Sequence, residues 1–362
     1  MVPKDDAVLW HAEPHTVAKI AILENYLNAW FQIFGRRSSG QDLLYVDGFA
    51  GPGRYTNASK GSPVAALRAA REVRANAGSN WTAGHIRCAF IESNADTYAY
   101  LEHHLQPFMN DSRLAVLLFN TTFVDGMARL RARMPLAFQG SQPLFVFIDP
   151  FGATGVPFSV VRDILASSRS EVLINLNADA IGRIFRAGEA ANHELLLTTA
   201  FGDGSWHDAL AGTLSARERS HAIVQLYMEH LRAVPNVRYV YSFEMLTAKT
   251  QVGKVGYFLV FASRHPRGLE KMKGAMKRMD QTGSYQFSNT RVGQAPLFRF
   301  NRPEDYAPSL HKQFVGQGPV RFGPDSTIHD FALLETPFEN PKKMLEVLDK
   351  QGLLHVTSTN PK

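Results

Sequence analysis

The sequence predicts an α/β fold in which a mixed, mostly parallel sheet carries helices on both faces. Short runs rich in β-branched and aromatic residues alternate with segments of helical periodicity, which is typical of this class. The strand-like runs cover 43–47, 86–92, 114–120, 143–150 and 171–177, and the helical segments cover 62–75, 95–106, 126–134 and 157–168. Two later runs, 237–246 and 255–263, are joined by a short connection with a glycine. They predict a hairpin that adds an antiparallel strand.

Both ends of the chain carry helical patterns outside this alternation. Apolar residues at helical spacing predict a helix over 15–34, ahead of the first strand. A cationic helix from 269 to 280, a passage rich in glycine, proline and arginine, and a helix, turn, helix and short strand follow the last sheet strand. The final segment resembles a winged helix. We therefore expect a sheet domain over 1–268 and a small helical, winged-helix-like module over 269–362.

Composition narrows the class of protein. The 362 residues and 45% hydrophobic content suit a large core, and no apolar run is long enough for a membrane span. The charged N-terminus does not look like a secretion signal. The single cysteine, Cys88, excludes an intramolecular disulfide and a cysteine cluster for metal, so we expect a cytoplasmic protein without a metal site. The net charge of +6 leaves a nucleic-acid partner open.

A glycine-rich turn follows the first strand, in the stretch LLYVDGFAGPGRYTNASKGSPVAAL from Leu43 to Leu67. Its spacing differs from the dinucleotide fingerprint GxGxxG, and the P-loop pattern is absent. It matches the turn of class I methyltransferases that holds S-adenosylmethionine. There an acidic residue ends the strand and faces the cofactor's ammonium group, and glycines let the backbone approach the methionine moiety. The residues that fit this turn are Asp47, Gly48, Phe49, Ala50, Gly51 and Gly53.

Other acidic and basic residues fall where such a cofactor needs them. Glu92 ends the second strand, where a carboxylate can accept hydrogen bonds from a ribose diol. Asp125 follows the third strand and is a candidate for the adenine amino group. His15 and Lys19 share one face of the predicted first helix and could meet a carboxylate or phosphate, although a solvated helix start explains them equally well.

The fourth strand ends in Asp149-Pro150-Phe151-Gly152. Amino-group methyltransferases carry [DN]-P-P-[FYW] here, where the acidic or amide oxygen and a proline carbonyl accept hydrogen bonds from the target NH2 and the ring stacks on the base. This chain has one proline, and its aromatic residue comes one place early. We assign Asp149, Pro150 and Phe151 as catalytic candidates, with a tight structural turn as the alternative. Cytosine C5 methylation would need a cysteine at this strand end, and Cys88 lies inside the second strand.

The motifs PHTxxKxxxLxxYLxxW, YVDGFAGPGRY, GSPVAAL, FIExN, FIDPFG and FASRHPRGLEKMK resemble the three-Cys-motif partner protein (TcmP) family over most of the chain. The resemblance implies a class I S-adenosylmethionine-dependent methyltransferase in a bacterial or prophage setting. It also implies a partner with a three-cysteine motif that resembles radical-S-adenosylmethionine enzymes. Within its last motif, Arg264, His265 and Arg267 could bind a phosphate or carboxylate of the substrate together with Gly152, or could cap a loop.

These observations favour a methyltransferase acting on an amino group of a nucleic-acid base. Two alternatives stay open at this point. One is a cofactor-binding partner of the three-cysteine protein with little or no activity. The other is methylation of a small molecule or a protein.

Overall fold

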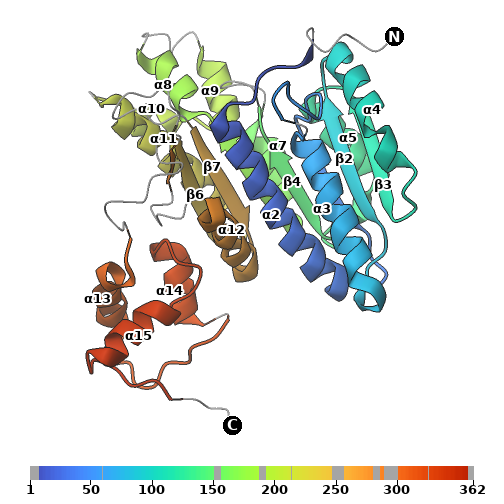
Figure 1. The fold of residues 1–362 in the computed structure, drawn as a ribbon. Helices are drawn as coiled ribbons and strands as arrows, with labels where there is room; N and C mark the ends of the chain where they lie inside the picture. The colour runs from blue at the N-terminus through green and yellow to red at the C-terminus, as the bar shows by residue number, and fades with distance from the viewer. Residues whose placement is uncertain are drawn as a thin grey trace.

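The computed structural model describes residues 8–58, 60–150, 156–186, 193–212, 214–246, 257–279, 286–288, 301–324 and 326–357. Its centre is an eight-stranded sheet with the order β3-β2-β1-β4-β5-β7-β6-β8 (Figure 1). Five neighbouring strands run parallel: β1 (Leu43–Asp47), β2 (Ile86–Glu92), β3 (Leu114–Asn120), β4 (Leu144–Ile148) and β5 (Ser170–Leu176). The predicted α/β fold class is confirmed.

The predicted antiparallel strand is also present. Strand β7 (Tyr257–Ser263) runs antiparallel to both β5 and β6 (Tyr239–Leu246). The connection between β6 and β7 lies outside the described residues. The short β8 (Gln286–Ser288) adds to β6 in parallel. Apart from β8, this is the strand order of the Rossmann-like class I methyltransferase fold.

Two layers of helices cover the sheet. One face carries α2 (Pro14–Arg37), α3 (Ser62–Ala77), α4 (Ala95–Met109) and α12 (Pro266–Met279). The other carries α5 (Phe123–Arg133), α6 (Pro135–Phe138), α7 (Phe158–Leu165), α8 (Ala178–Arg186), α9 (Glu194–Phe201), α10 (Trp206–Ala209) and α11 (Ala216–Ala233). Successive residues of β1 pack alternately against the two helix layers, so every residue of that strand is buried. This burial on both faces explains why the strand has an apolar sequence. None of the helices among the described residues has the length and apolarity needed to cross a bilayer.

The C-terminal part forms a separate small core from α13 (Pro303–Phe314), α14 (Thr327–Glu335) and α15 (Lys342–Lys350). The helix pair α14 and α15 was predicted, whereas α13 falls inside the passage rich in glycine and proline. The short strand expected near the end is not formed in the residues described up to 357. Among the described residues, the module has no strand at the position that a winged helix would require.

Helix α12 joins this module to the sheet. Its buried residues Leu269, Met272 and Met276 belong to the core beneath α2. Its fully buried Lys273 donates hydrogen bonds from Nζ to the carbonyl oxygens of Leu333 and Thr336, each at 2.6 Å. Helix α12 thus contacts both parts of the chain, and the domain boundary that we expected at residue 269 stays a prediction.

Candidate functional site

A cavity of about 210 Å³ opens at the carboxyl edge of β1, β4 and β5. In open α/β sheets this edge is where ligands bind. Segments from several parts of the chain line the cavity, and their residues include Trp10, His15, Lys19, Phe49, Ala50, Gly51, Gly53, Arg54, Tyr55, Gly61, Ser62, Asp149, Pro150, Asn175 and Tyr257. The glycine turn, the first helix and the end of the fourth strand thus meet in one place.

The turn after β1 depends on glycine at three positions. Gly51 has φ +60° and Gly53 has φ +82°, a left-handed conformation that favours glycine. Gly61 was not predicted as a site residue. Its N–H donates to the carbonyl oxygen of Gly53 at 2.6 Å, and a Cβ at position 61 would lie 2.8 Å from the Gly53 carbonyl carbon. The turn therefore packs directly against the start of α3, leaving its backbone exposed to the cavity.

Glu92 holds the same turn from the end of β2. Its Oε2 accepts a hydrogen bond from the Gly51 N–H at 3.0 Å, and its Oε1 accepts one from the Asn94 N–H at 2.8 Å. Each carboxylate oxygen has a second lone pair, so Glu92 keeps acceptor capacity for a ligand hydroxyl beside the turn. Glu92 is half-buried and does not itself line the cavity.

Asp47 is completely buried under the turn. Its Oδ1 accepts from the Phe49 N–H at 3.3 Å, while its Oδ2 has no hydrogen-bond partner among the described residues. Burial raises the pKa of Asp47 from its usual 3.8 to about 7; Asp149 adds to the rise and Ser62 opposes it. A buried, unsatisfied carboxylate oxygen costs free energy, and a ligand ammonium group would satisfy it. Asp47 lies beneath the turn and does not line the cavity, and its unpaired acceptor oxygen fits the amino group of S-adenosylmethionine.

Asp149 is held at the cavity wall by two side chains. Lys19 Nζ lies 2.5 Å from its Oδ2, and Asn175 Nδ2 donates to its Oδ1 at 2.6 Å. The sequence predicted Lys19 and Asp149 as site residues but not their direct contact. Asn175, near the end of β5, was missed because a single amide in an apolar strand carries no motif.

Tyr257 and His15 form the adjoining wall. The Tyr257 hydroxyl donates to the carbonyl oxygen of His15 at 3.1 Å, and their rings pack edge to face with centroids 5.4 Å apart. The Lys19 Nζ lies 5.6 Å from the centroid of the Tyr257 ring. The first turns of α2 thus reach the cavity.

The segment before α2 was not predicted to take part. Asn57 pairs with it twice, because the Ala12 N–H donates to Asn57 Oδ1 at 2.7 Å and Asn57 Nδ2 donates to the Ala12 carbonyl oxygen at 3.0 Å. These bonds place the Trp10 indole against the glycine turn, 3.8 Å from where a Cβ on Gly51 would lie. Trp10 therefore forms one rim of the cavity.

Other predicted residues lie elsewhere. Asp125 is exposed in the first turn of α5, where its carboxylate accepts a hydrogen bond from the Thr122 hydroxyl at 2.8 Å, and it does not line the cavity. Gly48 packs against the Phe123 ring, because a Cβ at position 48 would lie 2.6 Å from that ring. Phe151 and Gly152 lie outside the described residues.

The basic residues after β7 are also separated from the cavity. Since β7 is antiparallel, its last residue pairs with Glu171 near the start of β5, at the opposite edge of the sheet. Arg264 donates to the Leu165 carbonyl oxygen at 2.7 Å and so caps α7. The loop-capping alternative therefore fits Arg264, and the binding of a phosphate or carboxylate by His265 and Arg267 stays a prediction for the opposite edge of the sheet.

Crystal structures with a similar arrangement include an O-methyltransferase from Bacillus cereus in complex with SAH. It is 13% identical, with a TM-score of 0.34, and the match covers 66% of this chain and 80% of that one. The O-methyltransferase TomG from Streptomyces achromogenes, in complex with SAM, is 14% identical, with a TM-score of 0.34 and coverage of 71% and 92%. At these values the likeness assigns no activity to this chain. No family model matches the chain, and no curated protein sequence matches it.

Proposed function

We propose that this protein is an S-adenosylmethionine-dependent methyltransferase. The observation that carries the proposal is the buried Asp47, whose Oδ2 lacks a hydrogen-bond partner among the described residues, directly beneath a left-handed glycine turn. Asp47 would face the cofactor's ammonium group, the turn 49–53 would pack along the methionine moiety, and Glu92 would accept hydrogen bonds from the ribose. The bound cofactor supplies a methyl group on a sulfonium centre, ready for direct transfer.

We further propose that the acceptor is an amino group on a nucleic-acid base. Lys19 and Asn175 orient the Asp149 carboxylate, and each of its oxygens keeps a lone pair for an N–H of the target. Together with the Pro150 carbonyl, this would direct the nitrogen lone pair into the cavity, so that orientation supplies most of the rate enhancement. The net charge of +6 favours a polyanionic substrate.

The contact between Lys19 and Asp149 favours a second candidate. An Asp149 that already holds an ammonium group and an amide is less available to a substrate. A cofactor-binding subunit that serves the three-cysteine partner would need the glycine turn and Asp47 but not a free Asp149. Both candidates predict cofactor binding, but only the methyltransferase candidate predicts methyl transfer.

Transfer of a radiolabelled methyl group to DNA, RNA and cell extract separates them. The methyltransferase candidate predicts labelled product with the wild-type protein, at least a hundredfold less with Asp149→Ala, and unchanged cofactor affinity in that variant. Asp163→Ala is a matched control, since this carboxylate is half exposed and pairs with Arg131 away from the cavity. Labelling of extract protein or small molecules in place of nucleic acid would refute the base substrate. Cofactor binding without any labelling would favour the partner subunit.

A further inference from the structure

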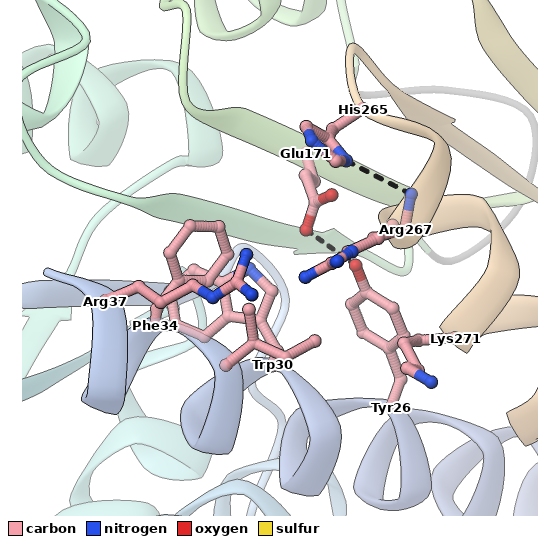
Figure 2. A pocket seen from close by; sticks show the side chains of 10 residues that line it. Tyr26, Trp30, Phe34, Arg37, Glu171, His265, Arg267 and Lys271 are labelled. Carbon is pink, nitrogen blue, oxygen red and sulfur yellow. Dashed lines mark hydrogen bonds between the residues drawn. The ribbon is translucent and has the colours of Figure 1, made fainter. Parts of the chain in front are cut away.

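A second cavity of about 110 Å³ lies at the amino edge of the sheet, between α2 and α12 (Figure 2). Among the described residues, none lines both this cavity and the cavity beside the glycine turn. Aromatic side chains of α2, namely Tyr26, Trp30 and Phe34, form much of its wall. The Trp30 and Phe34 rings are tilted, with centroids 5.1 Å apart. A space of this size accepts one apolar group no larger than a single ring.

The floor of this cavity is the buried carboxylate of Glu171. Its Oε2 accepts a hydrogen bond from the Tyr26 hydroxyl at 2.6 Å, and its Oε1 accepts one from the Ser263 hydroxyl at 2.8 Å. Gly268 allows α12 to approach this floor, because a Cβ there would lie 2.1 Å from Glu171 Oε1. Glu171 is thus satisfied from within the fold, and burial raises its pKa. It forms no ion pair with an arginine in the part of the chain that the structure describes.

Two guanidinium groups stand at the mouth. Arg37 comes from the last turn of α2 and Arg267 from the first turn of α12, and Figure 2 shows both turned toward the gap between the helices. Neither guanidinium makes a hydrogen bond or ion pair with a described residue. The neighbouring Lys271 is paired with Glu270 at 3.0 Å, and His265 Nδ1 accepts from the Arg267 backbone N–H. Two like charges that converge without an ion-pair partner among the described residues favour binding of an anion.

We propose that this cavity binds a carboxylate attached to a single apolar group. Guanidinium groups match the two oxygens of a carboxylate, and the aromatic wall accepts the apolar group beside it. This chemistry occurs in small aromatic acids and in the carboxy-terminal residue of a polypeptide. The apolar space is too small for a nucleotide, which separates this site from the methyl acceptor proposed above.

Calorimetric titration of the full-length protein with N-acetyl-L-phenylalanine tests this site. The acid should bind, and N-acetyl-L-phenylalanine amide, which lacks the carboxylate, should bind at least tenfold more weakly. Arg37→Gln and Arg267→Gln should each weaken binding of the acid at least fivefold. Arg36→Gln is the matched control, because Arg36 neighbours Arg37 in sequence but lines a different hollow, and it should leave the affinity unchanged.

A second titration distinguishes the two sources of the carboxylate. 3-Phenylpropionate has the same ring and acid without the amide, so equal binding of both compounds indicates a small aromatic acid. Tighter binding of the N-acetylated residue indicates a polypeptide terminus. Equal binding of the acid and its amide by the wild-type protein would overturn the proposal, and this comparison does not depend on whether the arginine variants fold. Wild-type affinity for the acid in both arginine variants would also overturn it.

Discussion

Replacing Asp47 by asparagine should stabilise the protein in the absence of cofactor. The carboxylate is fully buried, and its pKa rises from the usual 3.8 to about 7. Below pH 3.8 the folded and unfolded chains both hold this proton. Between pH 3.8 and about 7 only the folded chain holds it, so the free energy of unfolding falls as pH rises, and above pH 7 the loss is complete. At about 1.4 kcal/mol per pH unit, the full loss is about 4 kcal/mol.

Asparagine keeps an oxygen for the Phe49 N–H but cannot ionise. Urea denaturation should therefore show that Asp47→Asn gains up to about 4 kcal/mol over wild type at about pH 8.5, and much less at about pH 4.5. Asp163→Asn, at a half-exposed ion pair, should change the free energy of unfolding by less than about 1 kcal/mol. An Asp47→Asn protein that is no more stable than wild type at the higher pH would refute this account of the buried carboxylate.

Three further predictions follow from the same contacts. Cofactor affinity should increase as pH rises through about 7, because the ammonium group needs the ionised Asp47; a calorimetric affinity that is flat from about pH 6 to 8 would contradict this. Gly61→Ala should lower cofactor affinity at least tenfold, since its Cβ would displace the Gly53 backbone, and unchanged affinity would show that the turn tolerates the shift. Lys273→Met should lower the free energy of unfolding by about 1–3 kcal/mol in urea, because it leaves the Leu333 and Thr336 carbonyls without their donor.

The sequence predicted the parts of the site that lie at strand ends. Asp47 ends one apolar run and Asp149 follows another, and the alternation with helices predicts parallel strands for both, so their meeting at one edge followed from the fold class. Tyr257 and Asn175 could not be predicted, because they reach the cavity from strands whose apolar pattern gives no sign of a site. Trp10 depends on hydrogen bonds between the first residues and Asn57, which no local pattern reveals.

The basic residues after β7 lie away from the cavity for a physical reason. Residues that follow a strand lie near the ligand only if that strand ends at the carboxyl edge of the parallel strands. Strand β7 runs antiparallel to them and ends at the opposite edge. The sequence indicated the antiparallel hairpin, yet the motif around Arg267 was assigned a role without regard to it. The same reversal places Arg267 across from Arg37 and creates the second cavity.

Calorimetry of S-adenosylmethionine and S-adenosylhomocysteine tests the central claim most directly. Gly51→Ala and Gly40→Ala form a matched pair, since both glycines are left-handed, at φ +60° and +68°, but only Gly51 lines the cavity. We predict binding by wild type and Gly40→Ala, and at least tenfold weaker binding by Gly51→Ala. No heat from the wild-type protein with either compound would contradict the claim that this turn holds the cofactor.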